Sequence, residues 1–476
     1  MRPLPLLLSS ALLLVGPLMS PHESFAQAAP LEGQQMVLGI DSGDVEAPKT
    51  SRGPTVVFSA DVAGIDAPWM RLHFDNVVLA GSPSAGDGSF LRLTSSEDGA
   101  RQTLDVDDLQ AWGFSSAYFN GSKVLLEIVA YPGTGPNRVS LSSATVGELS
   151  QTPRSICGEE DDRVPTEDPR IGRVLPAGCT AFIVDEGDCA NRLLTAGHCL
   201  DGNTRVVQFN VPPSKPSGAL VHPGPEDQYP VDAASMEGIA QGAGRDFGTF
   251  VVGLNSETGL APRAAQGAAF HLADFVANDP TFYWRGVRVS GYGLDDGASN
   301  TTLQTDAGPL AAIDGTRLDY VLDTRGRNSG SPVIDLREGM VIGIHGHGGC
   351  HLPQFEVNSG TAIDHPGLVS TLDNGPAGTC EEHEHCVPDA YWYPDGSTDW
   401  SDAEPVDAWF DSENCFVRAL PPTDGEPFVH GRGYYVTPGP DGVCEVGWFD
   451  RANCLLGYAP EWRIPFFHNG AFYYIE

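Results

Sequence analysis

The sequence predicts an all-β protein of several domains. Apolar and polar residues alternate in short runs, of which residues 90–93 and 124–129 are clear examples. Clusters of Gly, Pro, Ser and Asp separate these runs, and the 476 residues include 56 glycines and 38 prolines. A chain of this length has room for about three domains.

The first 28 residues are expected to be a signal peptide. Arg2 precedes an apolar run over residues 4–18, and the small-x-small motif Ala26-Gln27-Ala28 follows it. A membrane anchor is the alternative, but the run is shorter than the roughly 20 residues that a span requires, and a Gly-Pro pair interrupts it. We therefore expect a secreted, extracellular protein without a membrane span, whose mature chain begins near Ala29.

Cysteine content and charge restrict the functional class. All ten cysteines lie between Cys157 and Cys454, and in an exported chain their number favours disulfide bonds. The 63 acidic and 27 basic residues give a formal net charge of −36, which repels phosphate backbones and anionic membrane surfaces. Nucleic acid is therefore excluded as an expected partner.

Two segments precede the part of the chain that carries the chemical motifs. Residues 31–150 have the short alternating runs of a β-sandwich, without a cysteine and without a recognisable grouping of reactive residues. Binding, assistance in folding and inhibition of the next domain remain open as roles for this module. Residues 151–170 are rich in Pro, Asp, Glu and Ser, which predicts an exposed acidic linker.

The C-terminal region, residues 380–476, contains an internal repeat. The Trp-Phe-Asp segment at Trp409 recurs at Trp448, and the Tyr pair at Tyr434 recurs at Tyr473, with the same offset (448 − 409 = 39 and 473 − 434 = 39). Units of this size need additional cross-links, so small disulfide-rich repeats are expected. We favour the repeat aromatics as the core of each unit over the alternative, contact with a glycan or cell surface.

Residues 171–375 carry three segments suited to acyl transfer by a serine. A serine hydroxyl is a weak nucleophile, so it needs an imidazole base, a carboxylate that orients the imidazole, and amide donors for the oxyanion. His198 follows an apolar strand and a Thr-Ala-Gly turn, and Asp246 opens an apolar strand. Ser329 lies among glycines that permit a sharp turn, and Cys199 can link the histidine turn to Cys179.

These motifs resemble the chymotrypsin-like (trypsin-like) serine peptidases. The resemblance rests on Thr195-Ala196-Gly197-His198-Cys199, on the Asp at a strand start, and on Asn328-Ser329-Gly330-Ser331-Pro332, in the order His, Asp, Ser. The last motif and residues 341–345 are most similar to the bacterial glutamyl endopeptidase branch. The resemblance covers about residues 170–372 and implies a domain of two packed antiparallel β-barrels with the site between them.

The resemblance also implies a role for each of these residues. His198 would be the general base and then the general acid, Asp246 its orienting partner, and Ser329 the nucleophile. The backbone amides of Arg327 and Ser329 would form the oxyanion hole. The family has glycine where this chain has Arg327.

The residue preference next to the cleaved bond is open between two readings. Asp323 lies where trypsin-like enzymes keep the carboxylate that selects a basic residue. Thr324 and His345 match the positions at which glutamyl endopeptidases receive an acidic side chain, because a hydroxyl and an imidazole can both donate to a carboxylate. We favour the acidic preference.

Activation and cofactors complete the expectations. Asn328 replaces the aspartate that pairs with a freed amino terminus in trypsin-like zymogens, so we expect latency to come from the N-terminal module covering the cleft. The short His- and Cys-containing runs at 345–351 and 380–386 have ligand types that suit zinc, but disulfides are favoured in an exported chain. No metal or cofactor is expected, and the substrates would be proteins or peptides. The rival function is an inactive peptidase homologue that binds a surface or a partner.

Overall fold

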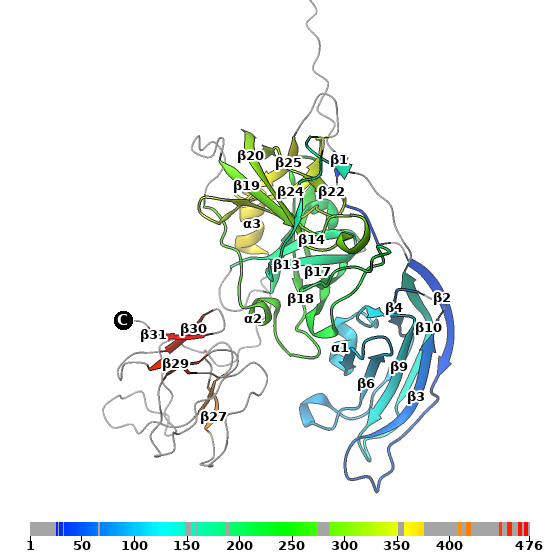
Figure 1. Ribbon diagram of the computed structural model, residues 1–476. Helices are drawn as coiled ribbons and strands as arrows, with labels where there is room; N and C mark the ends of the chain where they lie inside the picture. Colours follow the sequence, from blue (N-terminus) through cyan, green and yellow to red (C-terminus); the bar gives the residue numbers. More distant parts are fainter. Residues whose placement is uncertain are drawn as a thin grey trace, which may run out of the picture.

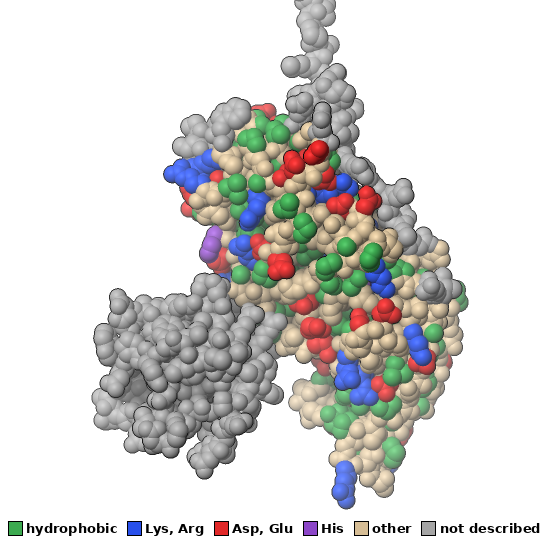
Figure 2. All heavy atoms as spheres, viewed as in Figure 1, with side chains coloured by type: hydrophobic (Ala, Val, Ile, Leu, Met, Phe, Trp, Pro, Cys, Tyr) green, Lys and Arg blue, Asp and Glu red, His purple; other side chains and the backbone are tan. Residues whose placement is uncertain are grey.

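The protein is mostly β-structure arranged in separate layers and barrels (Figure 1). This computed structural model describes residues 25–26, 28–31, 33–64, 67–147, 154–158, 160–185, 191–202, 204–274, 285–350 and 357–375. It also describes six short strands between residues 408 and 474. Acidic side chains are scattered over the visible face of the barrels and of the N-terminal module (Figure 2).

Two antiparallel sheets form the N-terminal module, as the alternating runs predict. One sheet has the order β2-β10-β4-β8 with β5 beside β10, and the other has the order β3-β9-β6-β7. The strands of the first sheet are β2 (Gly33–Asp41), β4 (Trp69–His73), β5 (Asn76–Val78), β8 (Phe119–Asn120) and β10 (Arg138–Gly147). Those of the second are β3 (Thr55–Ala63), β6 (Phe90–Ser95), β7 (Arg101–Leu104) and β9 (Lys123–Ala130).

The period-2 pattern explains the burial of this module. In β6 every second residue is buried, so Leu91 and Leu93 enter the core while Arg92 faces outward and pairs with Glu127 of β9 at 2.8 Å. A short helix, α1 (Val106–Ala111), connects the sheets and begins at Asp105, whose carboxylate accepts two backbone N–H groups. Its N-terminal turn is thereby capped.

Six antiparallel strands close into the first barrel. Their order is β13-β14-β15-β18-β17-β16. The strands are β13 (Ile171–Pro176), β14 (Cys179–Ile183), β15 (Arg192–Thr195), β16 (Thr204–Gln208), β17 (Gln228–Ala240) and β18 (Asp246–Val252). Three of these strands, β14, β15 and β18, are buried along their whole length.

Six further strands close into the second barrel, because β24 pairs with both β23 and β25. The ring runs β19-β20-β21-β25-β24-β23, and two short strands, β1 (Phe25–Ala26) and β12 (Val164–Pro165), add to β24 and β20. Its strands are β19 (Gly286–Gly291), β20 (Gln304–Asp314), β21 (Arg317–Tyr320), β23 (Pro332–Asp335), β24 (Val341–Gly348) and β25 (Asn358–Ala362). One continuous set of buried apolar side chains runs through both barrels.

The helices of the barrel region are short. They are α2 (Pro262–Gln266) and α3 (Pro366–Asn374), and each has a proline in its first turn. No helix among the described residues is long and apolar enough to cross a membrane.

The described part of the acidic linker differs from a free, exposed connector. Its strand β11 (Arg154–Ser155) pairs with β22 (Thr324–Arg325), and Ser155 is fully buried. Cys157 forms a disulfide with Cys350, which lies 193 residues away and follows the end of β24. The linker is therefore fastened to the second barrel, because it supplies a strand, a disulfide and buried polar groups to that surface.

The N-terminal module packs against the first barrel. Asn120 of β8 donates to the carbonyl of His222 and accepts from the N–H of His222, at 2.9 and 2.8 Å. The His222 ring stacks on Tyr118 with centroids 4.9 Å apart. Three barrel residues belong to the apolar core of the module, namely Leu175, Val206 and Leu220. The two units thus share buried surface.

Both copies of the C-terminal repeat form the same hairpin. Strand β26 (Ala408–Phe410) pairs with β27 (Phe416–Ala419), and β28 (Gly447–Phe449) pairs with β29 (Leu455–Tyr458), with the register shift at the equivalent residue. A third hairpin joins β30 (Pro465–His468) to β31 (Ala471–Tyr474). The cysteines from Cys380 to Cys454, for which disulfides are expected, lie outside the described residues.

Candidate active site

The three residues expected to react come from both barrels. His198 lies in a 3-10 turn (Gly197–Cys199) after β15, and Asp246 is the first residue of β18. Ser329 lies in the turn between β22 and β23 of the second barrel. The fold therefore brings three stretches that are distant in the sequence to the junction of the two barrels.

These three side chains form a continuous hydrogen-bonded line. Nε2 of His198 lies 2.8 Å from Oγ of Ser329, and Nδ1 of His198 lies 2.6 Å from Oδ2 of Asp246. The other oxygen of Asp246 accepts the backbone N–H of His198 at 2.9 Å. Asp246 is 1% exposed, so its carboxylate is held in a buried position with both oxygens engaged.

The turn that carries Ser329 depends on glycine at position 330. Gly330 has a φ of +90°, and a Cβ there would lie 2.0 Å from the carbonyl oxygen of Thr180. Thr180 also contacts Ser329, because its backbone N–H donates to the carbonyl of Ser329 at 2.8 Å. The hydroxyl of Ser329 is also 3.2 Å from the carbonyl oxygen of Gly346 in β24.

A disulfide fixes the histidine turn, as expected. Cys179, the first residue of β14, is bonded to Cys199, with their Cα atoms 6.2 Å apart. Because Cys199 directly follows His198, the bond ties the imidazole-bearing turn to the strand that contacts the serine turn.

Arg327 adopts the backbone conformation that favours glycine. Its φ is +79°, and the N–H of Asn328 donates to the carbonyl of Arg325 at 3.0 Å, which closes a turn with a positive φ at the third residue. The side chain is 2% exposed, and its Nη1 donates to Oγ1 of Thr301 at 2.9 Å. These bonds help to offset the strain of a positive φ in a residue with a side chain.

Thr324 and His345 are both buried, and each has a polar atom suited to a ligand. Oγ1 of Thr324 has no hydrogen-bond partner. Nδ1 of His345 lies 2.6 Å from the hydroxyl of Tyr320, and burial lowers the pKa of His345 to about 3. The imidazole is therefore neutral at physiological pH and carries a proton on only one of its two ring nitrogens.

Asp323 is engaged by the linker. Its carboxylate oxygens accept the backbone N–H groups of Cys157 and Asp162, at 2.6 and 2.7 Å. Burial raises the pKa of Asp323, while these two hydrogen bonds act in the opposite direction. Both carboxylate oxygens of Asp323 thus have hydrogen-bond partners within the chain. A carboxylate that selects a basic substrate residue would instead keep its oxygens available to the substrate.

Two neighbours of the site were not identified from the sequence. Nδ1 of His347 lies 3.6 Å from Oδ2 of Asp246, and burial lowers the pKa of His347 to about 4. The linker contact with Asp323 was also missed. The alternation of His345 and His347 along β24 was a signal that both rings could face the site region, but the sequence alone did not indicate which partners they meet.

Among the described residues, the only close group of metal-type ligands is Cys179, His198 and Cys199. Both cysteines are in a disulfide, so they offer no thiolate to a metal. Cys350, from the first zinc-compatible run, is also in a disulfide. The run at 380–386 lies outside the described residues.

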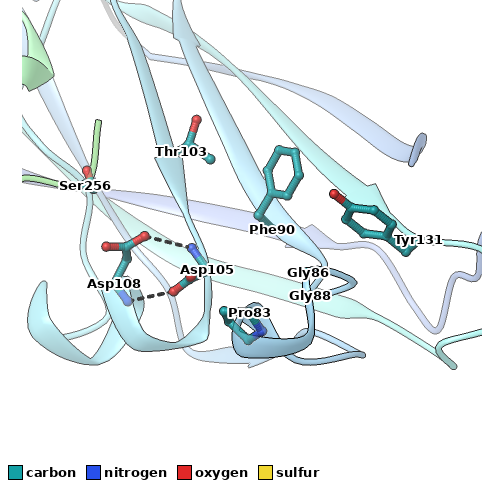
Figure 3. Close-up of a pocket in the computed structure, with 9 residues that line it drawn as sticks. All are labelled: Pro83, Gly86, Gly88, Phe90, Thr103, Asp105, Asp108, Tyr131 and Ser256. Atoms are coloured by element: carbon teal, nitrogen blue, oxygen red, sulfur yellow. Dashed lines mark hydrogen bonds between the residues drawn. The ribbon is translucent and has the colours of Figure 1, made fainter. Parts of the chain in front are cut away.

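A separate pocket of about 280 Å³ lies in the N-terminal module, with Ser256 of the barrel region at its rim (Figure 3). Its acidic groups belong to the cap of α1, since Asp105 accepts the N–H of Asp108 and Asp108 accepts the N–H of Asp105. Burial raises the pKa of Asp108 to about 6. These carboxyl groups are explained by the helix start and not by a ligand.

Comparison with known proteins gives the family of the central domain. Residues 179–344 match the family model described as trypsin-like peptidase domain. No curated protein sequence matches the chain.

Solved structures that match part of this chain include two peptidases and a binding protein. A Glu endopeptidase in complex with MPD is 17% identical, with a TM-score of 0.36, and the match covers 46% of this chain and 98% of that one. The thermostable serine protease AL20 from an extremophilic microorganism is 16% identical, with a TM-score of 0.33 and coverage of 44% and 98%. Human heparin binding protein is 12% identical, with a TM-score of 0.32 and coverage of 46% and 100%. Within residues 179–344, this chain therefore contains a trypsin-like peptidase domain.

Proposed function

We propose that the protein is a serine endopeptidase in which Ser329 is the nucleophile, His198 the general base and Asp246 its orienting partner. The observation that carries the proposal is the unbroken line from Asp246 through His198 to Oγ of Ser329, with contacts of 2.6 and 2.8 Å. A buried carboxylate on Nδ1 fixes the tautomer in which Nε2 accepts a proton from the hydroxyl.

The steps follow from this geometry. Oγ of Ser329 attacks the peptide carbonyl as its proton passes to Nε2 of His198, and Asp246 stabilises the imidazolium. The proton then moves to the leaving amine, and water hydrolyses the acyl-enzyme by the reverse roles. The backbone N–H groups of Arg327 and Ser329 are proposed as donors to the oxyanion, because they flank the turn that presents the hydroxyl.

We also propose a preference for an acidic residue before the cleaved bond. The unpartnered hydroxyl of Thr324 is a donor that a substrate carboxylate would satisfy. The neutral ring of His345 supports the same preference, because it precedes Gly346, whose carbonyl lies 3.2 Å from the hydroxyl of Ser329. When the hydroxyl of Tyr320 donates to Nδ1 of His345, the ring proton is on Nε2. Asp323 does not oppose this preference strongly, because two linker N–H groups already share its charge.

Casein digestion and active-site labelling test the proposed activity. The wild-type protein is expected to digest casein and to react with a fluorophosphonate probe, and Ser329→Ala is expected to do neither. Ser331→Ala is the matched control, because it removes a hydroxyl two residues away in the same turn. Absence of labelling in correctly folded wild-type protein would favour the rival function, an inactive homologue that binds a surface or partner.

A peptide panel tests the substrate preference. Peptides that differ only at the residue before the cleaved bond are expected to be hydrolysed fastest when it is Glu or Asp. Faster hydrolysis after Arg or Lys would assign the selection to Asp323 instead. Sequencing the amino terminus of the exported protein tests the proposed secretion, with Ala29 expected as the first residue.

A further inference from the structure

The segment just after the expected signal peptide lies along the candidate active site. Ala29 donates its N–H to the carbonyl of Gly178 at 3.0 Å, and Leu31 donates to the carbonyl of Pro176 at 2.7 Å. The residue numbers rise on one side and fall on the other, so residues 29–31 form an antiparallel pairing with the end of β13 and the turn after it. Ala29 is 4% exposed.

The contact is too close for a side chain at position 178. A Cβ on Gly178 would lie 1.7 Å from the carbonyl oxygen of Ala29, and Gly178 has a φ of +69°. The glycine therefore permits the backbone of the segment to approach the barrel directly.

Arg327 binds the carbonyl groups of the same segment. Its Nε donates to the carbonyl of Ala29 at 2.8 Å, and its Nη2 lies 3.4 Å from the carbonyl of Pro30. The guanidinium is held from its other side by Thr301. A charged donor to a buried carbonyl is one of the stronger hydrogen bonds, so the side chain that replaces the family's glycine acts here as a clamp.

Residues 25–26, at the end of the expected signal peptide, pair with the second barrel. Phe25 and Ala26 pair with Gly348 and His347 of β24 (Figure 1), next to Gly346, whose carbonyl lies near the hydroxyl of Ser329. On the other side, Gly178 lies two residues before Thr180, whose N–H binds the carbonyl of Ser329. Residues 25–26 therefore contact the second barrel beside Gly346, and residues 29–31 contact the first barrel beside the strand that binds the Ser329 turn.

The direction of the segment identifies which half of the cleft it fills. In a peptide substrate, the residues that follow the cleaved bond belong to the leaving amine. For a substrate that runs in the same direction, the edge at Pro176 and Gly178 would receive these residues. This edge adjoins Cys179, which forms a disulfide with Cys199. Cys199 directly follows His198, and His198 is the proposed proton donor to the leaving amine.

We infer that residues 29–31, clamped by Arg327, fill the leaving-group side of the cleft in the mature chain, and that substrates extending beyond the cleaved bond must displace them. This inference rests on the proposed peptidase function. Before processing, residues 25–26 occupy the other half as well, so the precursor is blocked on both sides. Removal of the signal peptide after Ala28 opens only the half that binds the acyl portion. The occupant is this short segment rather than the sandwich of the N-terminal module.

Two substrates measure access to the leaving-group side. The first is a peptide coumarin amide, which has no amino acid after the cleaved bond. The second is a quenched fluorescent peptide with the same residues before the bond and four residues after it. Both carry the residue that the peptide panel selects. The ratio of kcat/KM for the long peptide to kcat/KM for the coumarin amide cancels general changes in activity or in folded fraction.

Three variants of the chain that begins at Ala29 are compared with it. Arg327→Gly removes the clamp and keeps the backbone amide and the positive φ, and a deletion of residues 29–32 removes the occupant. Each is expected to raise the ratio about threefold or more, whereas Arg101→Gly, an exposed arginine of the module, leaves it unchanged. If the shortened chain does not fold, Arg327→Gly decides.

The two proposals fail in different ways. An unchanged ratio in Arg327→Gly, with the coumarin amide still hydrolysed, overturns the occupied-cleft inference and leaves the peptidase function standing. If correctly folded wild-type protein hydrolyses neither substrate, the peptidase function fails and the inference falls with it.

Discussion

Both carboxylate oxygens of Asp246 are engaged by one residue: Oδ1 accepts the backbone N–H of His198 at 2.9 Å, and Oδ2 faces its Nδ1 at 2.6 Å. The first contact fixes the position of the histidine backbone and the second fixes the ring. This pair therefore sets the direction in which Nε2 points, which is toward Ser329.

Replacing Asp246 with Asn should abolish most of the activity while the fold remains. The amide can hold the ring only by donating to Nδ1, which leaves Nε2 protonated and unable to accept the serine proton. We expect kcat/KM on a peptide substrate to fall about 10³- to 10⁴-fold. Asp335→Asn is the control, since Asp335 is equally buried but pairs with Arg285. A loss of less than tenfold in Asp246→Asn would contradict the proposed role.

Replacing Thr324 with Val should weaken the acidic preference selectively. Valine has nearly the same shape but removes the unpartnered hydroxyl, so an incoming carboxylate loses one donor. We expect kcat/KM for a glutamyl peptide to fall about tenfold, with a smaller change for the matched glutaminyl peptide. Equal losses on both peptides would indicate a packing effect and not recognition of charge.

Replacing Asn120 with Ala should destabilise the contact between the module and the first barrel. The change leaves the buried N–H and carbonyl of His222 without these partners, at an expected cost of about 2–3 kcal/mol in the free energy of unfolding. Denaturant unfolding measures the effect. Gln35→Ala, which removes an exposed hydrogen bond to Thr145, is expected to change stability by less than about 0.5 kcal/mol. Similar values for the two variants would show that the contact contributes little.

Acidification should destabilise the protein between about pH 6.5 and pH 4. Burial lowers the pKa of His347 to about 4 and that of His345 to about 3, whereas an unfolded histidine titrates near 6.5. The unfolded chain therefore binds more protons in this window, and the stability present above pH 6.5 is lost as the pH falls. The carboxyl groups whose pKa values burial raises, Asp108, Asp323 and Glu257, act in the opposite direction. Burial also lowers the pKa of His73 to about 4 and that of His222 well below its ordinary value, so two further histidines add to the loss of stability on acidification.

Thermal unfolding against pH measures this dependence. We expect Tm to fall by at least about 5 °C from pH 7 to pH 4.5. His347→Gln, which cannot titrate, should show a shallower slope over the same range. An identical slope in the variant would mean that His347 is not the source of the dependence.

A chain that starts near Arg170 tests whether removing the N-terminal module raises the activity or lowers the stability. If the module only covers the cleft, this shortened chain should be more active than the full-length protein. The structure gives a reason for a loss of stability instead, because the truncation exposes Leu175, Val206 and Leu220 and removes Cys157, the partner of Cys350. Comparing its Tm and its rate per folded molecule with those of the chain from Ala29 distinguishes the two effects.

The sequence by itself predicted the features that depend on neighbouring residues. The strands of the module follow from period-2 alternation, and the Ser329 turn follows from the glycines around it, since a positive φ is a local requirement. The link between Cys179 and Cys199 was also expected, because Cys199 directly follows the histidine whose turn it can hold.

Only the tertiary structure decided which distant groups share a charge or a hydrogen bond. Asp323 meets linker amides 166 and 161 positions away, and Arg327 meets the carbonyl of Ala29, 298 positions away in the sequence. Such contacts arise from how the two barrels and the N-terminal segment pack, and no local pattern encodes them. For that reason the candidate reactive residues could be predicted from the sequence. The position of residues 29–31 in the cleft and the hydrogen bonds of Asp323 could not.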